Sequence, residues 1–318
     1  MPSSIRIKSR IKSVKNTRKI TKAQELVASA KMRRAVQLTL DSRPYSNNVK
    51  GIVDDVRALI DQRSHPLLYG RPKANNTILI IVASDRGFCG GFNAQLAKKS
   101  LEFLRSRKEK CKVITIGKKI EPAIRRSEYE ILASFPSISN APSFERSRST
   151  GQLVYEEFLS QRADRIFLCY SDFKSAIAQI PTIVQLLPII PENELSAVAE
   201  QSVDEDEEEQ EEMSDSQRIA YDRAHAERYP LDYEMLFEPT PRYVLDHLLP
   251  RLIDTRLYQA MLESTASEHS ARMLAMRSAT DSATEMLDTL TFTFNQARQA
   301  SITREISEIS AGKAALEN

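Results

Sequence analysis

The stretch 251–311, RLIDTRLYQAMLESTASEHSARMLAMRSATDSATEMLDTLTFTFNQARQASITREISEISA, decides the architecture of this chain. It contains no glycine or proline, whereas Pro239, Pro241 and Pro250 precede it and Gly312 follows it. Because glycine and proline punctuate helices, the stretch predicts one continuous helix that would span roughly 90 Å. A helix of that length is several times longer than a small domain is wide, so it cannot be buried in a compact core.

Within this stretch, small and apolar residues recur in alternating steps of three and four. That spacing is the heptad seam of a coiled coil. Small residues in the seam favour a close approach of the partner helix. The predicted seam consists of Met276, Ala279, Ala283, Met286, Leu290, Thr293, Ala297 and Ala300.

The opposite end of the chain has the same character. Residues 4–42 lack glycine and proline and are rich in good helix formers. We expect Pro44 to end this helix and a second helical piece to occupy 49–62. Two apolar series run along the N-terminal helix, and they are out of phase with each other between Val14 and Ile20. The series are Ile7, Ile11 and Val14, followed by Ile20, Ala23, Val27 and Ala30.

The middle of the chain has another pattern, in which strands alternate with helices. β-Branched and apolar runs predict five strands, and the segments 93–107 and 151–161 predict helices. Such alternation favours a Rossmann-like α/β domain with a mainly parallel sheet. The predicted strands are 77–83, 112–116, 130–135, 165–170 and 182–187.

These elements suggest four regions and one arrangement. They are an N-terminal coil helix (1–62), a central α/β domain (75–190), a linker (191–238) and a C-terminal coil helix (240–318). The linker contains DEDEEEQEE at 204–212, with eight acidic residues in nine, which is typical of a solvated insertion. The two terminal helices should pair antiparallel, with the domain attached to their side.

The composition fits an intracellular protein. Net charge is +2, and the three cysteines include no CxxC pair, which suits a reducing compartment. There is no apolar signal core near the N-terminus. No run of eighteen apolar residues is present, so we expect no membrane span.

Three segments resemble the gamma subunits of F-type ATP synthases, in the same order along the chain. Residues 5–35 read IRIKSRIKSVKNTRKITKAQELVASAKMRRA, and residues 84–93 read SDRGFCGGFN. The third segment, 257–311, includes ARQASITREISEI. The resemblance covers most of the chain and is weak in 118–152 and 192–232. It departs from the usual pattern at Gln24, Lys313 and the stretch 233–239. The paired cysteines of the chloroplast redox insertion are absent.

The resemblance implies a central rotor shaft with no active site and no cofactor of its own. The coiled coil would enter a ring of three alpha and three beta subunits, and the α/β domain would lie near the epsilon subunit and the c-subunit ring. Torque would pass from the c ring, driven by protons, to the catalytic beta subunits. The complex would hold the chain peripherally at the cytoplasmic face of a bacterial plasma membrane. Arg298, Gln299, Thr303 and Glu305 would contact the catch loop of a beta subunit.

The N-terminal helix is strongly basic. Taken alone, a basic helix can bind nucleic acid or simply be solvated. The resemblance favours a third interpretation without nucleic acid, in which the positive face meets acidic loops of the beta subunits. Its main residues are Arg18, Lys19, Lys22, Lys31, Arg33 and Arg34.

The glycine-rich segment 84–93 follows a strand and opens a helix, a setting that can hold phosphate. Its glycines match neither a dinucleotide fingerprint nor a P-loop, so a tight structural turn is favoured over a nucleotide-binding enzyme such as a dehydrogenase. Structural roles are also the simpler interpretation of Cys89 and of the four histidines. None of these histidines lies at metal-ligand spacing from another. They are His65, His225, His247 and His269.

Overall fold

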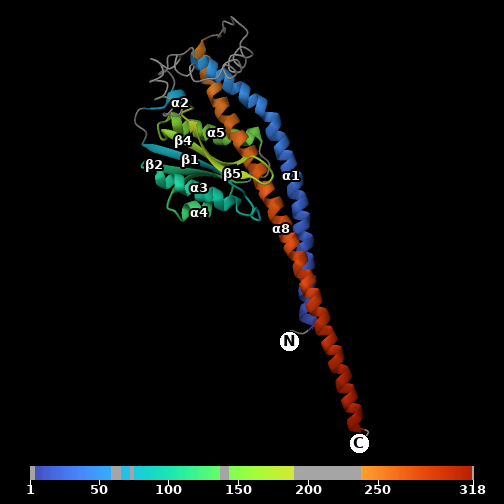
Figure 1. The fold of residues 1–318 in the computed structure, drawn as a ribbon. Coiled ribbons are helices and arrows are strands. Elements are labelled where there is room, and N and C mark those ends of the chain that lie inside the picture. The colour runs from blue at the N-terminus through green and yellow to red at the C-terminus, as the bar shows by residue number, and fades with distance from the viewer. Residues whose placement is uncertain are drawn as a thin grey trace, which may run out of the picture.

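Two long helices lie side by side, and an α/β domain is attached to their flank (Figure 1). The computed structural model describes residues 4–58, 66–71, 75–136, 143–189, 238 and 240–316. Helix α1 (Ser4–Ala58) has 55 residues and α8 (Pro241–Leu316) has 76. At the rise of an α-helix they are about 80 Å and 110 Å long. The acidic run 204–212 lies outside the described residues.

The two helices are antiparallel, as the sequence predicts. Three side-chain contacts between them show the direction, because partner numbers on α8 fall as those on α1 rise. Thr21 contacts Thr280, Glu25 contacts Arg277 and Ser42 contacts Gln259. Following this register, the N-terminus of α1 lies near residue 297 of α8, and the C-terminal part of α8 continues beyond it alone (Figure 1).

Both helices pass through prolines that the sequence analysis treated as boundaries, and that expectation is wrong. Pro44 lies inside α1 and Pro250 inside α8. A proline inside a helix costs about 3 kcal/mol, because it removes one hydrogen bond and clashes with a carbonyl. Around Pro250 tertiary packing outweighs this cost, since Leu249, Leu252 and Ile253 are all buried.

The true start of α8 is Pro241, where proline is favoured as the first residue of a helix. Thr240 caps it, because its hydroxyl accepts a hydrogen bond from the Tyr243 amide at 3.3 Å. At its other end α8 continues past Gly312 to Leu316. The helix is therefore longer at both ends than the glycine and proline positions predict.

The sheet of the α/β domain has the strand order β3-β2-β1-β4-β5. Strands β1 (Asn76–Val82), β2 (Lys110–Ile116), β3 (Glu130–Phe135) and β4 (Arg165–Phe173) are parallel to one another. Strand β5 (Gln179–Leu187) forms an antiparallel hairpin with β4. The prediction of a mainly parallel sheet is confirmed, and each predicted strand overlaps one of these five, although the first was predicted to end one residue later than β1 does.

Helices cover both faces of the sheet (Figure 1). Helix α3 (Phe92–Ser106) and the short α4 (Glu121–Arg125) pack on one face. The other face is covered by α2 (Pro66–Tyr69), α5 (Phe144–Leu159) and the first part of α8. Helices α2 and α4 have only four and five residues, too few for the sequence periodicity to indicate.

Helix α5 begins seven residues before the predicted start at Gly151. This glycine lies inside the helix, where a Cβ atom would collide with the Asp254 carboxylate of α8. Glycine therefore serves here to let two helices approach closely. Ser143 provides the helix cap, because its hydroxyl accepts a hydrogen bond from the Arg146 amide.

The first third of α8 belongs to the core of the domain. Leu245, Leu249, Leu257 and Met261 have no exposed surface and pack with the sheet residues of one apolar cluster. The length of the helix predicts that it lies outside any compact core. That expectation fails for this part of α8 and holds for the remainder, which leaves the domain as a rod.

Candidate functional site: the helix pair and its free end

The face of α1 that packs on α8 follows an uninterrupted heptad pattern. Buried and half-buried residues recur in strict steps of four and three from Ile7 to Ser42. The phase break expected between Val14 and Ile20 is absent, because Arg18, Thr21 and Glu25 continue the series. Ile20 and Val27, which look like seam residues by hydrophobicity, are 59% and 56% exposed. The series is Ile7, Ile11, Val14, Arg18, Thr21, Glu25, Ala28, Met32, Ala35, Thr39 and Ser42.

On α8, the residues that pack on α1 form a seam that differs from the predicted one. At several positions the buried residue is the one directly after the predicted residue. Among the predicted positions, Met276 and Ala283 are buried, Ala279, Leu290 and Ala297 are half-buried, and Thr293 and Ala300 are exposed. Met286 is 53% exposed, whereas its neighbour Leu287 is only 9% exposed. The most buried series is Met276, Thr280, Ala283, Leu287, Leu290, Phe294 and Ala297.

Polar contacts cross this seam. Glu25 has a side chain that is only 6% exposed, and its carboxylate lies 3.0 Å from Lys22 Nζ and 3.2 Å from Arg277 Nε. The hydrogen bond from Lys22, helped by Arg277, lowers the pKa of Glu25 in spite of burial. One turn away, the hydroxyls of Thr21 and Thr280 are 2.8 Å apart. Such paired polar groups fit together in one register, so they specify how the two helices align.

The segment 84–93 is a structural turn that packs against α8. Arg272 of α8 donates to the carbonyls of Arg86 and Gly87 at 3.3 Å and 3.2 Å. Phe88, which has the rarely adopted φ of 61°, is held at the tip of the turn with 73% of its surface exposed. Because Gly90 approaches Ala271 and Ala275, α8 occupies the space beside the turn.

A buried charged cluster anchors Arg272. Glu268, which is 2% exposed, accepts from Arg272 Nη2 at 2.8 Å. Burial raises the pKa of Glu268 to about 7, although Arg272 opposes the shift. Burial also lowers the pKa of the neighbouring His269 to about 4, with Arg272 and Lys31 adding to the effect. Burial therefore favours the neutral form of both groups where α8 leaves the domain.

A groove of about 360 Å³ lies between α1 and the turn. Its apolar lining includes the exposed side chains of Ile20, Val27 and Phe88, and Lys31 and Arg86 add positive charge. The hydrophobic pattern assigned Ile20 and Val27 to the helix seam and gave no sign of this groove. An apolar surface bordered by cations can receive a segment that combines apolar and acidic side chains.

The predicted basic residues of α1 lie along its surface. Arg18 is half-buried in the seam, and the remaining five are exposed. Lys22 forms an ion pair with Glu25, and Lys31 lines the groove. Each of these two side chains therefore has a neighbour within this chain. The other exposed residues are Lys19, Arg33 and Arg34.

The free end of α8 carries the residues for which a catch-loop contact is expected. Arg298, Gln299, Thr303 and Glu305 are all exposed, and the structure brings none of them onto α1 or the domain. The Thr303 hydroxyl donates to the Gln299 carbonyl within the helix at 3.0 Å. An exposed apolar stripe that was not singled out from the sequence accompanies them, formed by Ile302, Ile306 and Ile309.

The next residues are the cysteines and histidines, for which the sequence favours structural roles. Cys89 and Cys169 are buried, Cys111 is half-buried, and all three are free thiols. His247 lies 2.8 Å from the Tyr243 carbonyl, and His65 and His225 lie outside the described residues. Across the described ranges, no cluster of His, Cys, Asp and Glu could hold a metal ion. Among the helices within those ranges, none has a stretch long and apolar enough to cross a membrane.

Comparisons with known proteins agree on one family. The sequence profile of the family described as ATP synthase matches residues 3–316. The ATP synthase gamma chain of Pelotomaculum thermopropionicum is 36% identical over 317 residues, covering 100% of both chains. That of Chlorobaculum tepidum is 35% identical over 322 residues, covering 99% of both. The chain therefore belongs to the ATP synthase family, among its gamma chains.

Solved structures share the fold. One is a chain of the Euglena gracilis mitochondrial ATP synthase OSCP/F1/c-ring assembly, with a TM-score of 0.63 and 19% identity, covering 98% of this chain and 94% of that one. Another comes from the central stalk and c-ring of the Tetrahymena thermophila enzyme. It has a TM-score of 0.57 and 21% identity, covering 82% of this chain and 99% of that one. The helix pair with its lateral domain is thus the fold of a central-stalk subunit.

Proposed function

We propose that this chain is the central rotor shaft, the gamma subunit, of a proton-translocating F-type ATP synthase. It transmits torque from the membrane c ring to the catalytic beta subunits and has no catalytic site of its own. The observation that carries the proposal is the antiparallel rod of α1 and α8, whose free end projects beyond a lateral domain (Figure 1). Membership of the gamma chain family supports the same role.

The proposed partners follow from this role. The rod enters the ring of three alpha and three beta subunits, while the α/β domain meets the epsilon subunit and the c ring. Two solved relatives carry titles that name a central stalk with c-ring and an OSCP/F1/c-ring assembly. We propose that the complex lies at the cytoplasmic face of a bacterial plasma membrane, with this chain peripheral to it. The similarity to the gamma chains of Pelotomaculum thermopropionicum and Chlorobaculum tepidum supports this proposal.

The rod must present different surfaces to the three beta subunits. A rotor that touched all three alike would shift no binding equilibrium, since coupling requires differential contact. Here the groove with Phe88 and Lys31 lies on one side of the rod. We propose that it receives an apolar and acidic loop of one beta subunit at a time. Exposed ion pairs of about 0–1 kcal/mol suit contacts that must form and break in each turn.

The free end provides a second contact. We propose that Arg298, Gln299, Thr303 and Glu305 bind the catch loop of a beta subunit. All four are exposed and lie beyond Ala297, and every residue from 301 to 311 is exposed, so this end of the helix offers its whole circumference to the surrounding ring. The isoleucine stripe at Ile302, Ile306 and Ile309 would turn within an apolar part of that ring.

Co-purification tests this proposal. The chain is expressed with alpha and beta subunits of a related enzyme, and the mass of the intact complex is measured. We expect one copy per ring of six, with ATPase activity that depends on its presence. The double variant Arg298→Ala and Glu305→Ala should lower that activity, whereas the lateral Lys98→Ala should not. A complex that excludes the chain, or that holds several copies, would overturn the proposal.

A further inference from the structure

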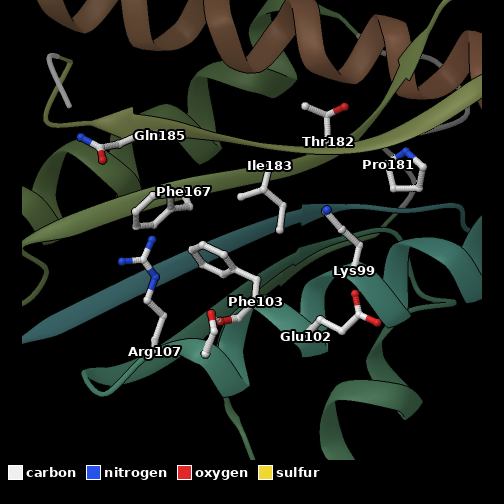
Figure 2. Close-up of a pocket in the computed structure, with 10 residues that line it drawn as sticks. Lys99, Glu102, Phe103, Arg107, Phe167, Pro181, Thr182, Ile183 and Gln185 are labelled. Atoms are coloured by element: carbon white, nitrogen blue, oxygen red, sulfur yellow. Dashed lines mark hydrogen bonds between the residues drawn. The ribbon is translucent and has the colours of Figure 1, made fainter. Parts of the chain in front are cut away.

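A second groove, of about 610 Å³, lies on the lateral domain between α3 and β5 (Figure 2). Its floor is formed by Phe103, Phe167 and Ile183, and the two cations Lys99 and Arg107 border it. Figure 2 shows these cations toward opposite ends of the apolar floor. The surface thus combines an apolar strip with a cation toward each end. The Glu102 carboxylate also lines it, so two cations and one anion border the groove.

Arg107 is held in place by aromatic rings. Its guanidinium carbon lies 4.6 Å from the centroid of Phe103 and 4.6 Å from that of Phe167. The two rings pack edge to face with centroids 4.8 Å apart. Cation–π contacts of this kind fix the guanidinium without satisfying its hydrogen-bond donors. The orientation is therefore set before any carboxylate binds.

Neither cation of this groove has an acidic partner within the part of the chain that the structure describes. The neighbouring charges are already matched, because Lys98 pairs with Glu102 and Arg165 pairs with Glu109. Lys99, Arg107 and Glu102 all line the groove, which leaves its lining with one excess positive charge. This charge favours an occupant that carries several carboxylates beside apolar side chains.

The chain itself contains such a segment close to the groove in sequence. Residues 204–212 have eight acidic side chains in nine, and LSAVA at 195–199 precedes them. The described part of β5 and its extension end at Ile189, four residues after the groove residue Gln185. Fifteen further residues can span about 50 Å when extended, so the acidic run can reach either end of the groove.

We propose that the acidic run 204–212 docks in the groove between α3 and β5 of its own chain. Its carboxylates pair with Lys99 and Arg107, and apolar residues near the run cover Phe103 and Ile183. A tethered segment is favoured over a separate acidic protein, because the tether gives it an effective concentration in the millimolar range. The docked run neutralises this face of the domain. The inference does not depend on the proposed rotor function.

Zero-length carbodiimide cross-linking of the purified full-length chain, followed by peptide mass spectrometry, tests the docking. This reagent joins only an amine and a carboxylate that are in contact. We expect a cross-link between Lys99 and the run 204–212 that weakens in 1 M salt, where the screening length falls to about 3 Å. The Lys99→Arg variant should lose the cross-link, because the charge stays while the amine is removed.

Three further variants distinguish specific docking from chance contact. Arg107→Gln should lower the Lys99 cross-link about threefold, as expected for the loss of one ion pair, whereas Arg105→Gln on the same helix should leave it unchanged. Replacing all eight acidic residues with their amides leaves the groove intact and should speed amide hydrogen exchange at 99–107. This second readout remains valid if Arg107→Gln perturbs folding.

Three results would overturn the proposal. The run could cross-link to lysines of α1 and not to Lys99. The amide-substituted run could leave exchange at 99–107 unchanged. In a complex assembled with partner subunits, Lys99 could cross-link to a carboxylate of another subunit, which would make that subunit the occupant.

Discussion

At the scale of single residues, polar side chains decide the alignment of the two helices. Glu25, Thr21 and Ser42 each meet a polar partner on α8. A hydrogen bond of this kind contributes about 1 kcal/mol, but a shift of the helices by one turn would break all three of these contacts between α1 and α8. Hydrophobicity alone could not identify these positions, which explains the false phase break predicted between Val14 and Ile20.

Glu268 and His269 make stability depend on pH in opposite directions. The folded pKa of Glu268 is about 7 against an ordinary 4.5, so between these values the folded chain holds a proton that the unfolded chain has lost. Stability therefore falls as pH rises through that window. The folded pKa of His269 is about 4 against 6.5, so its contribution rises over its own window.

We predict that Glu268→Gln removes the loss of stability caused by this carboxyl group. Relative to the variant, the free energy of unfolding of the natural chain should fall from pH 4.5 to pH 7 and level off above it. Urea unfolding at several pH values measures this difference. The neighbouring variant His269→Gln is the control and should change only the acidic range. An equal pH dependence in the natural chain and Glu268→Gln would contradict the assignment.

At the scale of elements, burial and not local propensity determines where the long helices begin and end. Pro250 would stop an isolated helix, but apolar contacts on both sides of it hold α8 together. The sequence predicts a helix start at Gly151, whereas the actual role of this glycine is visible only once α5 and α8 are placed together. The strands, by contrast, were predictable because their apolar runs are short, β-branched and buried.

The seam of α8 can be tested at adjacent positions. We predict that Leu287→Ala lowers the free energy of unfolding by about 2 kcal/mol, at the low end for a buried leucine because the helix pair is only partly enclosed. Met286→Ala should change it by less than about 0.5 kcal/mol, as expected for an exposed site. Thermal and urea unfolding of the full chain measure both. Equal effects, or a larger effect at Met286, would restore the seam predicted from sequence.

At the scale of the whole molecule, α8 is the element that joins the lateral domain to the tip of the rod. It packs on the domain as far as Arg272, pairs with α1 through Ala297 and ends alone at Leu316. Packing against α1 stiffens the rod, because a single exposed helix is marginally stable in water. Torque applied to the domain therefore reaches the tip through one continuous helix.

The sequence predicts this architecture well and its contact surfaces less completely. The free-end residues Arg298 and Glu305 came from family resemblance, and their exposure is compatible with a contact that no isolated chain can display. The groove around Phe88 was not predictable, because it arises where α1, α8 and the turn converge. Surfaces formed by segments distant in sequence leave no local pattern.

A truncation before Ser301 tests whether the free end of α8 contributes to the stability of the lateral domain. We predict that ending the chain before Ser301 leaves the melting temperature of the lateral domain, followed by circular dichroism, unchanged, because residues 301–311 are all exposed. The coupling of ATP hydrolysis to rotation should weaken in the assembled complex. A melted domain in the truncated chain would show that the tip has a structural role instead.

Rotation of the lateral domain is the most direct measurement of the central claim. A bead is attached through Lys108→Cys, in a Cys111→Ser background, to a complex immobilised by its alpha and beta subunits, and ATP is added. The rotor account predicts continuous rotation of the bead in one direction, at a rate that follows ATP hydrolysis. A bead that stays fixed while the complex hydrolyses ATP would contradict it.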